Sequence, residues 1–151
     1  MNRPAKGMVA ALVMTILVAG CGGGLTSEER VSIMRQAQEA GVYLNFRRIQ
    51  VASSYKEDLP VVLNHVEEAF KKIGARQYDR RLIGDKYGAI WSMKGGGGLI
   101  FVNPVVKDSK ELVTLVILTP RPLEWTASGY EGAIKILRML NEQLTPVAIQ
   151  D

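Results

Sequence analysis

The sequence predicts an α+β domain in which a mainly antiparallel sheet of about five strands has two helices packed on one face and a further helix at its N-terminal end. Three observations support this fold class. Two apolar stripes with helical spacing lie between residues that start and stop helices. Between these stripes, short strand-like segments follow one another with brief connections, which favour antiparallel hairpins. The 151 residues, 47% of them hydrophobic, suffice for one domain with its own core.

The N-terminal helix is predicted by a capping box. Thr26 and Glu29 have the spacing in which each side chain accepts a hydrogen bond from the other residue's backbone N–H. Gly41 has the backbone freedom that ends a helix. The apolar side of this helix is expected to comprise Val31, Met34 and Ala37.

A strand is predicted for residues 42–51. Apolar and polar residues alternate in its first half, but the phase changes across Arg47 and Arg48, which indicates a β-bulge. The polar stretch that follows, with Ser53 and Lys56, is expected to connect this strand to the next helix.

The second helix is predicted between Asp58, a capping residue, and Gly74. Pro60 is tolerated in its first turn, and Lys71 and Lys72 suit its negative C-terminal end. Its apolar stripe comprises Leu59, Val62, Leu63, Val66, Phe70 and Ile73.

Two strands with alternating patterns are predicted after this helix, near residues 78–82 and 87–93, with a turn at Gly84 and Asp85. The four glycines at residues 95–98 are expected to end the second of these strands as a flexible hairpin. They precede a strand rather than a helix and lack the spacing of a phosphate-binding loop, so they do not indicate a nucleotide site.

Two further strands are predicted at residues 99–102 and 112–118, where the sequence is almost continuously apolar. Asn103 and Pro104, and then a polar turn at residues 107–110, connect them. Apolar runs of this kind are typical of strands near the middle of a covered sheet.

The last helix is predicted from a second capping box, formed by Ser128 and Glu131, to the residues before Pro146. Its apolar face is expected to comprise Ala133, Ile134, Leu137, Leu140 and Leu144.

The first twenty residues have the layout of a secretion signal. Arg3 and Lys6 precede an uncharged apolar run at residues 8–18, which is shorter than the roughly 20 residues that a membrane-spanning helix needs. The small residues Ala19 and Gly20 then lead to Cys21, the one cysteine of the chain.

The sequence Val18-Ala19-Gly20-Cys21 resembles the lipobox of bacterial lipoproteins. This resemblance implies cleavage before Cys21, which would carry a diacylglycerol and usually a third acyl chain. Two or more chains anchor a protein stably to a membrane. The alternative is an ordinary signal peptide followed by a buried free cysteine. The implied organisation is a signal peptide at residues 1–20, a lipidated cysteine and glycine-rich tether at 21–25, and a periplasmic domain at 26–151.

The residue after Cys21 is Gly22 rather than the Asp that is usual in lipoproteins retained in the inner membrane of Gram-negative bacteria. The resemblance therefore implies the periplasmic face of the outer membrane, or the outer face of the cytoplasmic membrane if the source is not Gram-negative. The order of elements over residues 42–144 also resembles small uncharacterised Gram-negative lipoproteins and, more distantly, the helix-grip domains of outer-membrane assembly lipoproteins.

Composition argues against several classes of function. The net charge is +4, but loss of Arg3 and Lys6 with the signal would leave 17 basic residues against 15 acidic ones, a balance that does not indicate nucleic-acid binding. A single cysteine excludes an internal disulfide framework. Ser53 and Lys56 have the Ser-x-x-Lys spacing of penicillin-binding enzymes, but the accessory motifs of those enzymes are absent from the sequence. His65 and Glu68 are too few to make a zinc site. We therefore expect no catalytic residues, metal or cofactor, although carboxylate chemistry stays open.

Two groups of residues are candidates for contacts with a partner. A basic cluster could bind an anionic lipid headgroup or an acidic partner, or could simply be solvated surface. The cluster comprises Lys71, Lys72, Arg76, Arg80 and Arg81. In the proline-rich segment at residues 119–125, Arg121 and Trp125 are residue types favoured at interfaces, although Trp125 could instead cover one end of the core.

The function expected from these features is that of a membrane-anchored, non-enzymatic accessory or adapter protein that binds another envelope protein. The alternative is a carrier that binds a lipid or other apolar ligand between the sheet and its helices. Trp91, Met93 and Phe101 could line such a cavity or fill it.

Overall fold

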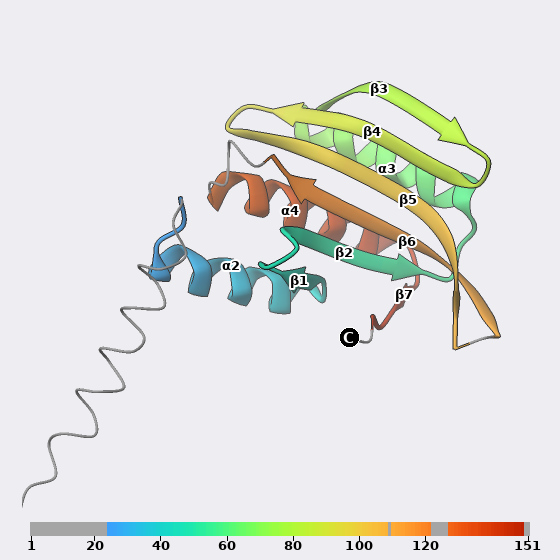
Figure 1. Ribbon diagram of the computed structural model, residues 1–151, viewed down its shortest axis with the longest axis horizontal. Coiled ribbons are helices and arrows are strands. Elements are labelled where there is room, and N and C mark those ends of the chain that lie inside the picture. Colours follow the sequence, from blue (N-terminus) through green and yellow to red (C-terminus); the bar gives the residue numbers. More distant parts are fainter. Residues whose placement is uncertain (1–23, 109, 122–126, 150–151) are drawn as a thin grey trace, which may run out of the picture.

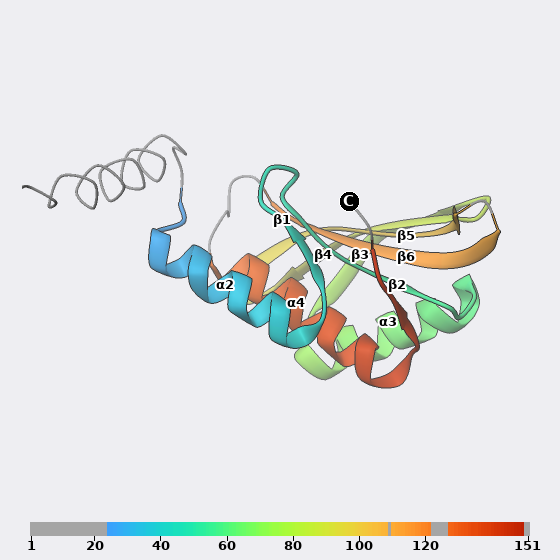
Figure 2. The ribbon, with the colours of Figure 1, turned by 90° about the horizontal axis from the view of Figure 1, so that it is seen from below.

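The computed structural model describes residues 24–108, 110–121 and 127–149, and within them three helices lie on one face of a seven-stranded antiparallel sheet (Figure 1). The α+β class is confirmed, with more strands in the sheet than predicted. The helices are α2 (Ser27–Ala40), α3 (Leu59–Ile73) and α4 (Ala127–Gln143). Figure 2 shows all three on the same side of the sheet.

The strands follow the order β1-β2-β6-β5-β4-β3, and β7 pairs with β2 beside this path. Every pairing is antiparallel. The strands are β1 (Tyr43–Asn45), β2 (Gln50–Tyr55), β3 (Arg76–Ile83), β4 (Lys86–Met93), β5 (Gly96–Lys107), β6 (Glu111–Pro120) and β7 (Pro146–Val147). The long β5–β6 hairpin therefore forms the centre of the sheet, and β3 forms one edge.

The helix ends follow the predicted signals. Glu29 N–H donates to Thr26 Oγ1 at 3.1 Å, and Thr26 N–H donates to the Glu29 carboxylate at 2.8 Å, so the first capping box is confirmed. Asp58 caps α3, and Gly41 and Gly74 end α2 and α3 in the left-handed region, with φ of 67° and 71°. These signals are local in sequence and do not depend on what the helix packs against.

The hydrophobic core lies between the sheet and the helices α3 and α4. Trp91 on β4 is fully buried, and its ring centroid lies 6.1 Å from that of Phe70 on α3. Ile100 on β5 and Leu118 on β6 are fully buried on the same side of the sheet. Ile134 on α4 packs into the same cluster. Alternation along each strand places these residues toward the helices and their neighbours on the opposite face.

A polar clasp ties the start of α3 to the end of α4. The Glu57 carboxylate accepts hydrogen bonds from the Thr145 backbone N–H at 2.9 and 3.0 Å and from its hydroxyl at 2.8 Å. The Thr114 hydroxyl donates to the Glu57 carbonyl oxygen at 2.7 Å. Partial burial opposes ionisation of Glu57, but the bonds from Thr145 outweigh it and hold the pKa of the carboxyl below its usual value.

The apolar side predicted for α2 is wrong in part. Ile33 and Ala37 are buried, whereas Val31 and Met34 are 64% and 56% exposed. The helix packs against α4 and β1 rather than across the sheet, and this packing selects the side with Ile33. Val31 and Met34 lie on a second apolar side that short-range periodicity does not distinguish from the first.

The predicted bulged strand is also wrong. Residues 42–51 contain most of a β1–β2 hairpin, in which Tyr43 pairs with Ala52 and Ile49 adopts a positive φ of 54°. The change of phase in the sequence reflects reversal of the chain rather than one extra residue. β2 then continues to Tyr55, so Ser53 lies in a buried strand instead of a connection.

The expected hairpin is present between β4 and β5, but its turn includes only the first of the four glycines, and the other three belong to β5. The turn consists of Lys94 and Gly95, which has a φ of 85°, and β5 begins at Gly96. A Cβ on Gly97 would lie 2.7 Å from the Trp91 carbonyl oxygen, and one on Gly98 would overlap the Thr119 carbonyl oxygen. Small residues are therefore required here because the neighbouring strands approach closely.

Two further boundaries differ from the prediction. β5 continues through Asn103 and Pro104 to Lys107, so these residues pair with β6 instead of interrupting the sheet. Helix α4 begins at Ala127, which places Ser128 inside its first turn rather than at the cap. The preceding residues 122–126 lie outside the described part of the chain.

Candidate functional site

The face of the sheet opposite the three helices is the candidate site, and we call it the open face. Figure 1 looks onto it, with α3 and α4 behind the strands. Strand register places two mostly apolar rows across this face, which we call the apolar rows. One row runs through Ile90, Leu99 and Thr119. The other runs through Gly88, Phe101, Ile117 and Ala52.

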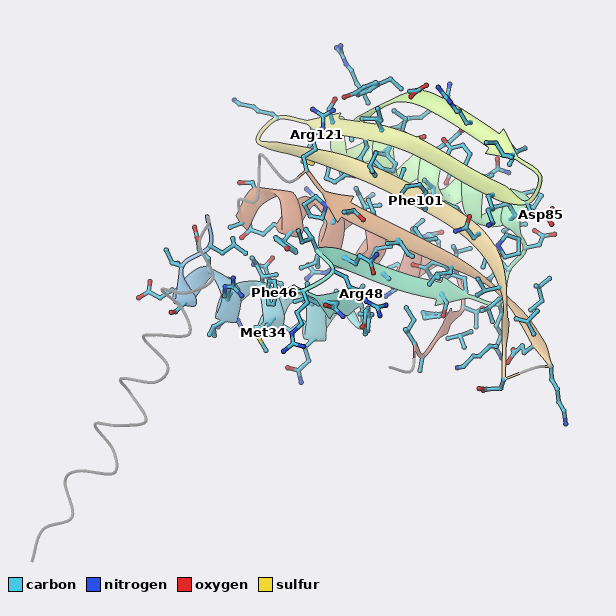
Figure 3. All side chains as sticks on the ribbon, in the orientation of Figure 1. Met34, Phe46, Arg48, Asp85, Phe101 and Arg121 are labelled. Atoms are coloured by element: carbon cyan, nitrogen blue, oxygen red, sulfur yellow. The ribbon has the colours of Figure 1, made fainter. Side chains whose placement is uncertain are left out.

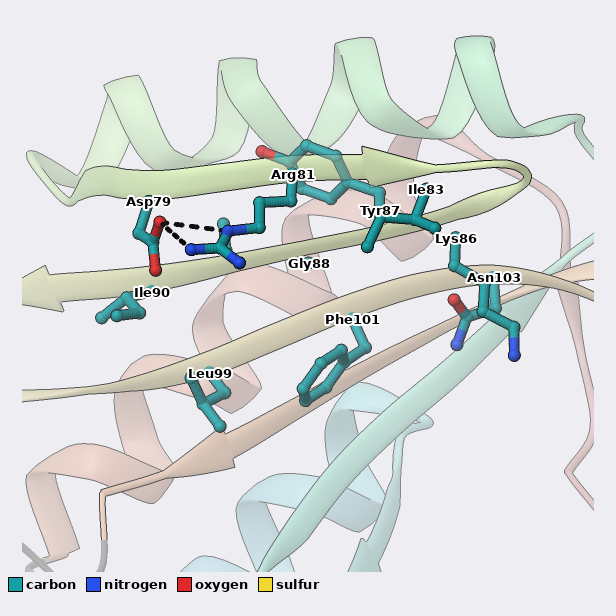
Figure 4. Close-up of a pocket in the computed structure, with 11 residues that line it drawn as sticks. Asp79, Arg81, Ile83, Lys86, Tyr87, Gly88, Ile90, Leu99, Phe101 and Asn103 are labelled. Carbon is teal, nitrogen blue, oxygen red and sulfur yellow. Dashed lines mark hydrogen bonds and ion pairs between the residues drawn. The ribbon is translucent and has the colours of Figure 1, made fainter.

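A shallow depression of about 460 Å³ lies on the open face over β3, β4 and β5 (Figure 4). Leu99 and Phe101 of β5 and Ile90 of β4 form its apolar floor. Gly88 has no side chain, and a Cβ there would lie 3.5 Å from the Phe101 ring, so the ring lies across the strand at this point. Leu99 and Phe101 are 41% and 40% exposed, although they occupy the middle of the sheet.

A second depression, of about 320 Å³, lies on the open face where β1, β2 and β6 meet. Leu115, Ile117 and Ala52 give it an apolar base, and Arg48 lies at its margin. The open face is therefore hollowed on both sides of the central hairpin, and the second depression is the more polar of the two because Asn45 and Gln50 also line it.

Basic residues surround the apolar rows. The strand register places some of them on the open face, and others lie at a strand end beside it. These residues are Arg76, Arg81, Lys86, Lys107 and Arg121. The acidic residues beside them are Asp79, Glu111, which is opposite Lys107, and the turn residues Asp85 and Asp108. Asp79 forms an ion pair with Arg81 at 3.3 Å. The margin of the open face thus carries a net positive charge.

Arg121, a candidate from the sequence, lies at one corner of the open face. Its backbone N–H donates to the Gly97 carbonyl oxygen at 3.0 Å, and its guanidinium contacts the Tyr78 hydroxyl of β3. Figure 3 shows Arg121 at the end of the sheet and Phe101 near its middle. Trp125 and Cys21, which are also candidates, lie outside the described residues.

The predicted basic cluster is divided between two sides of the molecule. Arg80 pairs with Glu67 of α3 at 3.2 Å on the helix side, whereas Arg81 belongs to the open face. A register shift in β3 between Tyr78 and Arg81 separates them. Lys71 and Lys72 are exposed in the last turn of α3, and Arg76 begins β3.

The two candidate catalytic pairs lie at the end of β2 and on α3. Ser53 is buried in β2 and its hydroxyl has no hydrogen-bond partner, whereas Lys56 is exposed. His65 Nδ1 lies 3.7 Å from a Glu68 carboxylate oxygen on a partly exposed side of α3. Within the described ranges, no three His, Cys, Asp or Glu residues are grouped closely enough to hold a metal ion. The helices described there include none long and apolar enough to cross a membrane.

Sequence reasoning did not single out Leu99 and Ile117, and it grouped Phe101 with Trp91 beside the helices, whereas Phe101 is 40% exposed on the open face. The signal was nevertheless present, because runs that are apolar at every position supply both faces of a strand. Comparisons with known protein families, curated proteins and solved structures find no match to this chain.

Proposed function

We propose that this protein is a lipid-anchored, non-enzymatic adapter of the bacterial envelope and that its open face binds another envelope protein. The main support for the proposal is that Leu99 and Phe101 are exposed although they lie in the middle of the sheet. Ile100, between them on the other side of the same strand, is fully buried. Contiguous apolar surface at the centre of a sheet is costly in water and is typical of a protein interface.

The membrane anchor in this proposal rests on the lipobox-like sequence that ends at Cys21. Cys21 is six positions before Ser27, the first residue of α2, and a fully extended chain spans at most about 3.6 Å per residue. A lipid on Cys21 would therefore keep α2 within about 20 Å of the membrane surface. An adapter held this close to the membrane would act at that surface, where membrane-bound partners are within its reach.

A carrier with its ligand between the sheet and the helices is the second candidate, and the packing argues against it. The largest side chains on the helix side, including Trp91, Tyr55 and Ile100, are fully buried among one another and the helices. The two depressions over the apolar rows lie on the opposite side of the sheet. An apolar ligand would find open surface on that side rather than in the interior.

Photocrosslinking in intact cells tests the proposal. A photoreactive amino acid replaces Leu99 on the open face or, as a control, the exposed Lys135 on α4. We expect Leu99 to yield a crosslink to one specific envelope protein that Lys135 does not yield, and we expect Cys21→Ala to reduce it. The proposal fails if the two positions yield the same products, or if Leu99 yields no protein crosslink.

A further inference from the structure

We propose that the open face binds an acidic amphipathic helix of a partner protein, laid along the strands. This inference rests on the proposed function, because it names the element that the adapter recognises. Three properties of the open face support it: the sign of its charge, the distance over which that charge is spread, and the shape of its apolar centre.

Charge favours an acidic occupant. Five basic residues lie on the open face or at its margin, as described above, and Arg48 borders the second depression. The acidic residues there are Asp79, Asp85, Asp108 and Glu111, and the ion pair between Asp79 and Arg81 cancels one charge of each sign, so a net positive charge is left. Two copies of the chain placed face to face would bring these basic margins together, and like charges facing each other across an interface are unfavourable. A second copy of this chain is therefore disfavoured, and a segment with acidic flanks is favoured.

The length of the basic margin favours a helix over a single lipid headgroup. Arg121 is hydrogen-bonded at Gly97, and Lys107 ends the same strand ten residues later. At about 3.3 Å per residue, this separation is about 33 Å. One headgroup cannot contact both ends, whereas a helix of about 20 residues, at 1.5 Å per residue, spans about 30 Å.

The apolar centre fits the side of a helix. A sheet that is apolar on both faces is stable when helices cover both, and α3 and α4 cover only one face here. The apolar stripe of a partner helix would lie over Leu99, Phe101 and Ile117, and its acidic flanks would face Arg81 and Lys86. The result is a three-layer arrangement with the sheet in the middle.

Strand addition at the sheet edge is a less suitable mode of binding. On edge strand β3, the pairing with β4 breaks between Tyr78 and Arg81, and Asp79 has a positive φ of 51°. A bulge and charged side chains on an edge strand prevent an incoming strand from pairing regularly. At the other edge, β1 has only three residues.

The spacing of crosslinks distinguishes a helix from an extended segment. Photoreactive residues at Leu99 and Val105 would lie on one face of β5, six positions or about 20 Å apart. On a partner helix, that distance corresponds to about 13 residues. On an extended partner segment it corresponds to about 6 residues. The full lipidated protein is used in intact cells, and the crosslinked partner peptides are identified by mass spectrometry.

Charge reversal provides the second arm of the experiment. Arg81→Glu with Lys86→Glu should lower the crosslink yield from Leu99 by about tenfold or more, because two attractive contacts become repulsive. The matched control is Lys135→Glu with Arg138→Glu on the exposed side of α4, which should leave the yield unchanged. Immunoblotting confirms equal amounts of each variant, so that a folding defect is not read as lost binding.

The outcomes separate the inference from the proposed function. Partner sites about 13 residues apart in an acidic segment, with the loss on charge reversal, support the inference. Sites about 6 residues apart, a basic segment or an unchanged yield overturns the helix but leaves the adapter function standing. Crosslinks only to lipid or to a second copy of this chain overturn both, as does the absence of any crosslink from both positions.

Discussion

At the scale of single residues, two glycines in the central strands have different roles. A Cβ on Gly98 would overlap the Thr119 carbonyl oxygen and come within 3.0 Å of Pro120 Cα, so backbone atoms would have to move. A Cβ on Gly88 would meet only the Phe101 ring, at an ordinary contact distance of 3.5 Å. Gly98 therefore serves strand packing, whereas Gly88 shapes the open face.

This difference predicts opposite outcomes for the same substitution. Gly98→Ala should destabilise the fold by about 1 to 3 kcal/mol, because neighbouring backbone cannot yield cheaply. Gly88→Ala should change the free energy of unfolding by less than about 0.5 kcal/mol. Urea denaturation of the purified proteins measures both values. Equal losses for the two variants would contradict the assignment of Gly98 to close strand packing.

The clasp at Glu57 predicts a dependence of stability on pH. Its pKa is lower in the folded protein than in the unfolded chain, where a Glu has a pKa of about 4.3. The stabilisation is therefore present above that value and is lost as the pH falls through the lower pKa of the folded state. Glu57→Gln should lower the urea midpoint at pH 7 but make much less difference at pH 3. An equal difference in urea midpoint between the two proteins at pH 7 and pH 3 would show that ionisation of Glu57 does not contribute to stability.

At the scale of elements, features that depend on residues close together in the sequence could be predicted, whereas features that depend on distant packing partners could not. The capping residues Thr26 and Asp58 were predictable because a cap bonds backbone groups three residues away. The buried side of α2 was not, because α4 and β1 select it and both lie beyond the helix itself. The β1–β2 hairpin was mistaken for a bulge for a similar reason: both interrupt the alternation, and only the pairing partner tells them apart.

Helix α2 offers a matched pair of substitutions. Ile33→Ala should cost about 2 to 5 kcal/mol of stability, because it empties a fully buried site against α4 and β1. The adjacent Met34→Ala should cost less than about 0.5 kcal/mol, since this side chain is 56% exposed. Chemical denaturation compares the two variants. A larger loss for Met34→Ala would mean that α2 packs through the side originally predicted from the sequence.

At the scale of the whole molecule, the sheet has apolar residues on both faces, but the helices in the described ranges cover only one of them. The nearly continuous apolar runs of β5 and β6 predicted a covered sheet. Leu99 and Phe101 differ from that prediction, because both side chains are exposed. The sequence could not indicate which alternate residues face the helices, because both sets are apolar. The basic margin could not be recognised from the sequence either. Arg121 and Arg81 are 40 positions apart, and only the order of the strands places them on the same face.

The central claim is that another molecule covers the open face in the cell, and the reactivity of an introduced thiol tests it directly. Because Cys21 is the one cysteine in the sequence and the proposed lipid would block it, Leu99→Cys supplies a single reactive thiol. Arg138→Cys, on the exposed side of α4, is the control. With a membrane-permeable maleimide, Leu99→Cys should react slowly in intact cells and rapidly once purified, while Arg138→Cys reacts rapidly in both. Equal, rapid reaction of Leu99→Cys in cells and after purification would contradict the claim.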